Sequence, residues 1–76
     1  MIIKKIEINT PYITLNQFLK LTGLINNGGE AKMWLANNSV LVNNESENRR
    51  NKKLYDQTIV EFDGVKYLIC GSQEQE

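Results

Sequence analysis

The sequence predicts an α+β fold: a single small domain in which two short helices pack on a small antiparallel sheet. The chain has 76 residues, enough for one domain. Segments 15–22 and 29–37 have apolar residues at helical spacing, whereas segments 2–8, 40–42 and 58–69 are rich in β-branched and aromatic residues. We therefore expect residues 1–76 to form one domain, with a frayed polar tail at 71–76.

The first half should contain a strand followed by a helix. Residues 2–8 have strand-forming side chains, and Pro11 ends this strand. Thr14 and Gln17 have the spacing of a capping box, in which each side chain accepts a hydrogen bond from the backbone of the other residue. The first helix should therefore begin at about residue 15, and Gly23 should end it.

The second helix and the strands after it also have local signals. A helix over 29–37 would turn Ala31, Trp34 and Leu35 inward. A strand over 40–42 then leads into a tight Asn43-Asn44 turn, and the polar stretch 45–53 is expected to be a loop. Asp63-Gly64 predicts a hairpin that joins strands over 58–62 and 65–69.

The composition gives no support to catalysis or to a bound cofactor. Histidine is absent and Cys70 is the single cysteine, so the usual zinc ligand sets cannot be built. There is no glycine-rich phosphate loop and no set of nucleophile and base. We therefore expect a protein that is not an enzyme and has no metal, cofactor or small-molecule substrate. No signal peptide or membrane span is recognisable, which predicts a cytoplasmic protein.

The charge is distributed unevenly although the total is zero. Residues 1–53 have eight Lys or Arg and four acidic residues, whereas residues 54–76 have one lysine and five acidic residues. The densest basic group is Arg49, Arg50, Lys52 and Lys53, with no acidic residue among them. A basic group of this kind is typical of a surface that binds nucleic acid.

Several motifs, in a fixed order, resemble one family of RNA-binding modules. They are Thr14-Leu15-x-Gln17-Phe18-Leu19-Lys20, Gly28-Gly29-Glu30-Ala31-Lys32-x-x-Leu35, Val40-x-Val42-Asn43-x-Glu45, Asn48-Arg49-Arg50 and Lys53-Leu54. This set, over about residues 12–62, resembles the S-four RNA-binding domain, which was first known from small-subunit ribosomal protein S four and is also called the alpha-L motif. It is most similar to the short stand-alone bacterial members of the YaaA type. The resemblance implies binding to structured RNA, in particular ribosomal RNA, a role in ribosome assembly and ribosomal proteins as further partners.

The sequence departs from the pattern of this family at three places. Asn44 and Asn51 stand where the family usually has glycine, and Asp56-Gln57-Thr58 stands where a Pro-Gly-Asp turn is usual. Asparagine tolerates a positive φ, so the first two departures should leave the fold intact.

We expect the RNA-binding surface to combine the basic loop with the two helices. Arg49, Arg50, Lys52 and Lys53 would bind phosphates, and Lys20, Gln17 and Lys32 would extend the surface. Gly28 and Gly29 would allow a close approach of the backbone and offer free N–H groups to a phosphate.

Simpler interpretations remain open. The loop could be an ordinary solvated one paired with Glu45 and Glu47, Lys20 and Lys32 could be ordinary exposed helix lysines, and Gln17 could serve the capping box alone. The three tyrosines are far apart in sequence and are assigned no role. The alternative is that the chain is a protein-interaction module, which binds a partner protein through its sheet edge or its acidic C-terminal half. Binding of such a partner would persist after nuclease treatment.

Overall fold

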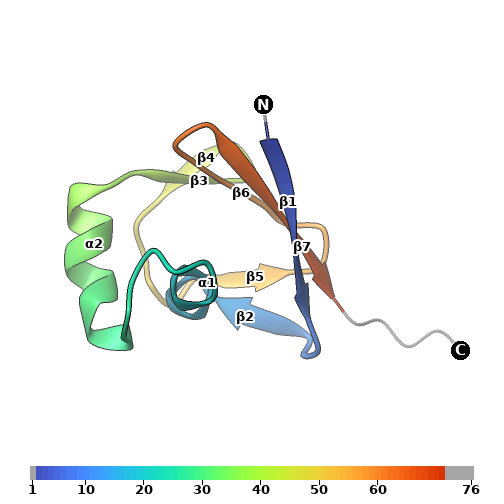
Figure 1. The fold of residues 1–76 in the computed structure, drawn as a ribbon, viewed down its shortest axis with the longest axis horizontal. Helices are drawn as coiled ribbons and strands as arrows, with labels where there is room; N and C mark the ends of the chain where they lie inside the picture. The colour runs from blue at the N-terminus through green and yellow to red at the C-terminus, as the bar shows by residue number, and fades with distance from the viewer. Residues whose placement is uncertain (1, 72–76) are drawn as a thin grey trace, which may run out of the picture.

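The structure is a computed structural model that describes residues 2–71, and it confirms the α+β class (Figure 1). A mixed five-stranded sheet has the order β1-β7-β6-β3-β4, and a separate two-stranded sheet is formed by β2 and β5. In Figure 1, α1 lies between the two sheets and α2 lies at one end of the molecule. The elements are β1 (Ile2–Ile8), β2 (Tyr12–Thr14), α1 (Leu15–Leu21), the 3-10 turn η1 (Gly28–Glu30), α2 (Ala31–Asn37), β3 (Val40–Val42), β4 (Glu45–Glu47), β5 (Lys53–Tyr55), β6 (Ile59–Phe62) and β7 (Val65–Gly71).

The predicted capping box is present at the start of α1. Thr14 accepts a hydrogen bond from Gln17 N at 3.2 Å, and Gln17 Oε1 accepts one from Thr14 N at 2.9 Å. The helix ends at Leu21, with Thr22 as its C-cap and Gly23 at a φ of 80°. The predicted first helix is therefore confirmed to within one residue.

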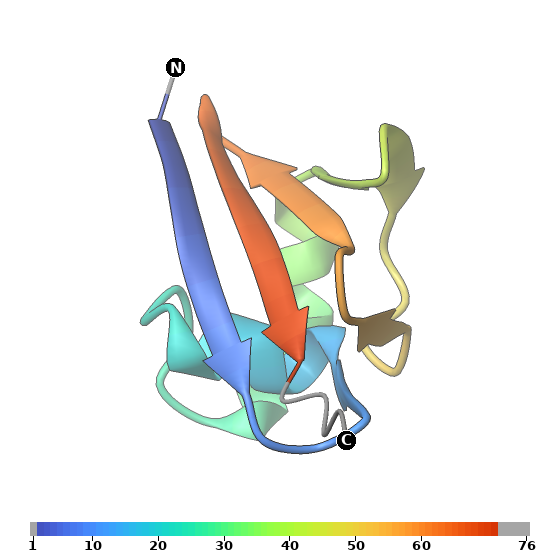
Figure 2. The ribbon, with the colours of Figure 1, turned by 90° about the vertical axis from the view of Figure 1, so that its right-hand side faces the viewer.

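The prediction of a purely antiparallel sheet is wrong at one edge. The first and last strands, β1 and β7, pair in parallel from Ile2↔Val65 to Ile8↔Gly71, and Figure 2 shows their arrows side by side and pointing the same way. The other ladders of this sheet are antiparallel. A strand pattern in the sequence indicates which face is buried but not the direction of the neighbouring strand, so this pairing was not predictable from periodicity.

The segment predicted as a loop over 45–53 contains β4 and the first residue of β5. The predicted turn before it is confirmed: Asn43 and Asn44 have φ of 52° and 71°, which allow a tight reversal from β3 into β4. The short strands β2, β4 and β5 were missed because each has three residues and, unlike the equally short β3, none of them is a continuous run of β-branched and aliphatic side chains.

The remaining elements lie close to their predicted positions. The second helix starts as η1 at Gly28 and continues as α2 from Ala31 to Asn37. The hairpin at Asp63-Gly64 is confirmed, with φ of 56° and 80°, although its strands run over Ile59–Phe62 and Val65–Gly71. The predicted frayed tail 71–76 lies outside the described residues, apart from Gly71 at the end of β7. Within residues 2–71, no helix is long and apolar enough to cross a membrane.

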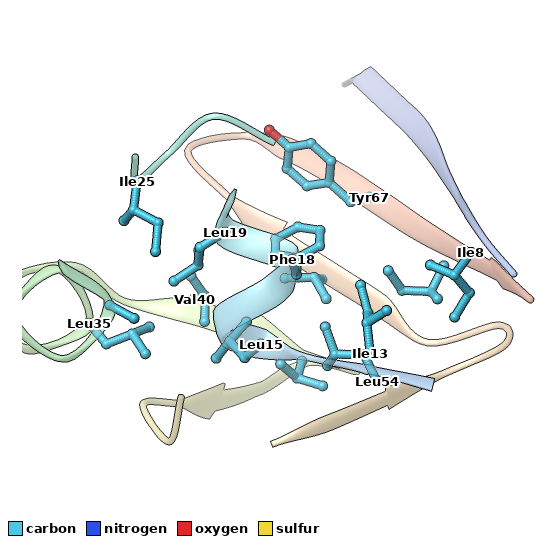
Figure 3. Packing of buried hydrophobic residues seen from close by; sticks show 14 residues of the cluster. Ile8, Ile13, Leu15, Phe18, Leu19, Ile25, Leu35, Val40, Leu54 and Tyr67 are labelled. Carbon is cyan, nitrogen blue, oxygen red and sulfur yellow. The ribbon is translucent and has the colours of Figure 1, made fainter. Parts of the chain in front are cut away.

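The core surrounds α1 and explains which side of this helix remains outside. Leu15, Phe18 and Leu19 are fully buried between the large sheet and the small one, as Figure 3 shows. The Phe18 ring meets Tyr67 of β7 edge-on, with ring centroids 5.1 Å apart. On α2, Ala31 and Leu35 are buried, as expected for its inward stripe. The predicted inward Trp34 is half-buried and packs against Phe62, with ring centroids 4.9 Å apart.

Candidate nucleic-acid interface

The backbone of the basic loop is fixed against the first turn of α1. Leu15 N donates to the carbonyl of Lys52, and Asn16 N donates to the carbonyl of Arg50, both at 2.8 Å. A tight turn closes between them, because Lys52 N donates to Arg49 O at 3.1 Å. The first N–H groups of a helix have no partner within the helix, so loop carbonyls satisfy them here. The loop backbone therefore faces the helix, while Arg49 and Arg50 are exposed.

This attachment brings the basic loop next to the second helix. A shallow hollow of about 390 Å³ is lined by Lys32 of α2 together with Asn48, Arg49, Arg50 and Asn51 of the loop. Three of these five residues are cationic and none is acidic. Lys32 and the loop thus share one surface, although many residues separate them in the sequence.

Arg49 is oriented by an acidic residue at the end of β4. Glu47 Oε2 accepts hydrogen bonds from Arg49 Nε at 2.8 Å and from Arg49 N at 3.1 Å, and Glu47 Oε1 accepts one from Nη2 at 3.3 Å. The hydrogen bond from the guanidinium lowers the pKa of Glu47, and the same contact raises the pKa of Arg49. The Arg49 side chain is 70 % exposed and that of Glu47 only 12 %. The loop pairing considered in the simpler interpretation is thus present at Glu47, and it leaves most of Arg49 accessible.

The two glycines before α2 occupy a capped turn. The N–H of Gly29 donates to Asn27 Oδ1 at 2.9 Å, so the expectation of a free N–H at this residue is wrong. Asn27 is the N-cap of η1, and its side chain takes up a donor that a helix start would otherwise leave open. A Cβ added at Gly28 would lie 3.4 Å from Asn16 Nδ2, which is ordinary van der Waals contact. The backbone of η1 therefore packs on the side chain of Asn16 in α1.

Gln17 and Lys20 lie on the outer side of α1 but differ in their surroundings. The side chain of Gln17 is engaged with Thr14 and lines a different hollow, of about 500 Å³, together with residues that include Glu7 and Ile8. This position favours the capping interpretation of Gln17. Lys20 is exposed in the last turn of α1, one turn after Asn16, whose N–H binds the basic loop.

The last two cations of the loop extend toward the small sheet. Lys52 is half-buried, whereas Lys53 is exposed and pairs with Thr14 across the β2–β5 ladder. Lys53 Nζ lies 4.9 Å from the centroid of the Tyr12 ring. Tyr12 in turn contacts Tyr55, with ring centroids 5.6 Å apart. This tyrosine pair was missed in the sequence, because no local signal predicts that β2 and β5 pair.

Comparison with known proteins identifies the family. A family model described as the S4 domain matches residues 6–70. This chain belongs to the S4 domain family. A relative from Bacillus subtilis (strain 168), named "Probable ribosome maturation protein RlbA", is 52 % identical over 59 residues, which cover 78 % of this chain and 83 % of the relative. The resemblance inferred from the ordered motifs is thereby confirmed.

Two of the three places at which this S4 domain departs from the expected pattern have a residue with positive φ. Asn44 has a φ of 71° and Gln57 a φ of 73°, so both adopt the left-handed conformation at positions where the pattern has glycine. Asn51 is not among the non-glycine residues with positive φ in the described part of this S4 domain.

Within residues 2–71, no three or more His, Cys, Asp or Glu side chains form a group that could hold a metal ion.

Proposed function

We propose that this S4 domain is a non-catalytic RNA-binding protein that recognises structured RNA, specifically ribosomal RNA, and acts in ribosome assembly. The hollow that joins Lys32 to Arg49 and Arg50 is the observation that supports this proposal most strongly. The name of the Bacillus subtilis relative, which refers to ribosome maturation, supports the cellular role. Such a protein would act in the cytoplasm, with ribosomal proteins as neighbours on the same RNA.

Phosphate binding would supply most of the affinity. Lysine and arginine side chains neutralise phosphates and release the counterions condensed on the RNA. Arg50 is exposed and lines the hollow, and a guanidinium can bind a phosphate through two parallel hydrogen bonds. Because the loop backbone is hydrogen-bonded to α1, the backbone that carries these cations is already ordered before RNA arrives, which lowers the entropic cost of binding.

The shape of the surface suits folded RNA. A-form helices have a wide, shallow minor groove, and proteins recognise them mainly through backbone shape, phosphates and 2′-hydroxyls. The hollow is open and lies between a short helix and a loop, so it can follow a phosphate ridge without enclosing a base. Asn48 and Asn51 in the same hollow offer amide groups that can bind 2′-hydroxyls.

The proposal can be tested with purified protein and fragments of ribosomal RNA. The double variant Arg49→Ala/Arg50→Ala should bind the RNA more weakly than the wild type, while its thermal unfolding followed by circular dichroism should change by no more than the small contribution of the exposed Arg49–Glu47 pair. Lys4→Ala/Lys5→Ala is a matched control, because it removes the same charge from exposed positions of β1. Unchanged RNA affinity in the arginine variant would remove the loop from the site.

The cellular target and the protein-interaction alternative can be separated in one further experiment. Crosslinking the protein in cells and sequencing the attached RNA should recover ribosomal RNA. If the protein is instead an interaction module, its partners should stay bound after nuclease treatment and be lost when the hairpin over 58–69 is altered.

A further inference from the structure

The small β2–β5 sheet has one buried face and one face that carries two tyrosines. Ile13 and Leu54 are paired in the ladder and are buried in the core. The next pair, Tyr12↔Tyr55, points the other way because side chains alternate along a strand. Tyr12 is 37 % exposed and Tyr55 is 51 % exposed. The two rings contact each other at 5.6 Å with an interplanar angle of 51°, and together they present an aromatic surface to solvent.

This aromatic surface is continuous with the basic loop. Lys53, the first residue of β5, directly follows the loop, and its Nζ lies 4.9 Å from the Tyr12 ring centroid. The carbonyl of the preceding residue, Lys52, is held by Leu15 N. In Figure 1 the chain after β4 passes between α2 and α1 before it enters β5. Lys53 therefore links the basic loop to the tyrosine pair, and an RNA that contacts both would extend from the loop along β5.

The charges beside the tyrosines favour an anionic ligand. Lys53 is exposed at one end of the pair. The acidic neighbour in sequence, Asp56, is turned toward the end of β7, because its Oδ1 accepts a hydrogen bond from Gly71 N at 2.8 Å and another from Gln57 Nε2 at 3.2 Å. These hydrogen bonds hold the Asp56 carboxylate, which keeps its charge, toward Gly71, and the charged group that contacts the Tyr12 ring is the ammonium of Lys53.

We infer that Tyr12 and Tyr55 form a platform on which an unpaired base stacks next to the structured part of the RNA, with Lys53 binding the phosphate of that nucleotide. The inference rests on the proposed RNA-binding function and adds a substrate class: structured RNA with an adjoining single-stranded nucleotide. Every base has a flat face that can stack on an aromatic ring, and duplex bases are already stacked on each other. The platform therefore selects unpaired nucleotides without reading their sequence.

Two RNA probes test this platform: a blunt RNA hairpin, and the same hairpin with a short single-stranded oligouridine tail. Wild-type protein should bind the tailed hairpin more tightly. The variant Tyr12→Leu/Tyr55→Leu should lose about 5- to 150-fold in affinity for the tailed hairpin for each stacked base, and little for the blunt one. Tyr12→Phe/Tyr55→Phe should keep the preference, because stacking needs the ring and not the hydroxyl. Ile3→Ala is the control for an exposed apolar side chain on another strand, since Ile3 is 65 % exposed.

A second measurement uses the wild-type protein, so it does not depend on the folding of a variant. A tail that contains 4-thiouridine is crosslinked by light, and the modified peptide is identified by mass spectrometry. Crosslinks at Tyr12, Lys53 or Tyr55 support the platform.

The remaining outcomes overturn the inference in distinguishable ways. Equal binding of both hairpins by the wild type, crosslinks confined to other residues, or an equal loss for both hairpins in the leucine variant would remove the platform and leave the proposed function standing. Binding of neither hairpin would contradict the proposed function itself. If a protein partner stays bound to the wild type after nuclease treatment but does not bind the leucine variant, the tyrosines belong to a protein interface.

Discussion

The salt dependence of RNA binding provides a quantitative test of the basic surface. The perturbation is the double variant Lys32→Gln/Arg50→Gln, which removes two cations of the hollow, one from each side. Arg49 is left in place, because its removal would also leave Glu47 without its partner. Both substituted residues are exposed, so their loss should leave the stability of the fold nearly unchanged.

The magnitude follows from the number of cations on the surface. If Lys32, Arg49, Arg50, Lys52 and Lys53 each neutralise one phosphate, the logarithm of affinity should fall with the logarithm of salt concentration with a slope of about −3.5 to −4.5. Removing two of these contacts should make the slope shallower by about 1.4 to 1.8. The affinity at low salt should fall at the same time.

The assay is fluorescence anisotropy with a labelled fragment of ribosomal RNA, titrated at a series of potassium chloride concentrations. Lys4→Gln/Lys5→Gln is the matched control, since it changes the total charge equally at exposed positions of β1. The control should keep the wild-type slope. An unchanged slope in the variant of the hollow, or an equal change in the control, would refute the idea that Lys32 and Arg50 contact phosphates in one local site.

Three further predictions concern stability. Phe18→Ala should lower the free energy of unfolding in urea by about 3–5 kcal/mol, because the ring is fully buried; a loss well below that range would contradict its central place in the core. The hydrogen bond from Arg49 lowers the pKa of Glu47 from its ordinary 4.5. The stability that the Arg49–Glu47 pair gives to the folded protein is therefore complete above pH 4.5, and it is lost as the pH falls through the lowered pKa of Glu47 in the folded state. The stability difference between wild type and Glu47→Gln should therefore shrink in acid, and a difference that stays constant with pH would show that the ion pair is not its source. Gln57 has a φ of 73°, a left-handed conformation that is strained for a residue with a Cβ. Gln57→Gly should therefore raise the free energy of unfolding by up to about 1 kcal/mol, and Gln57→Val should lower it. Thermal melts of both variants test this, and a glycine variant less stable than the valine variant would contradict backbone strain at this position.

Much of the candidate surface could be predicted from the sequence because its parts are local. The basic loop is visible as a run of Lys and Arg, and the exposed side of the first helix follows from the apolar positions Leu15, Phe18 and Leu19. The hydrogen bond from Gly29 to Asn27 was missed although it is also local, because the glycine pair was interpreted as a helix entry with free N–H groups rather than as a capped one. The roles of these residues in RNA binding remain predictions.

The sequence alone determined the features that depend on hydrogen bonds and backbone angles over a few residues. These are the capping box of Thr14 and Gln17 and the turns at Asn43-Asn44 and Asp63-Gly64. Only the tertiary structure decided that β1 runs parallel to β7, that Lys32 lies beside the basic loop, and that Tyr12 meets Tyr55. The physical reason is that these contacts join segments far apart in the chain, and their pairing is selected by packing around the whole core, which no local pattern encodes.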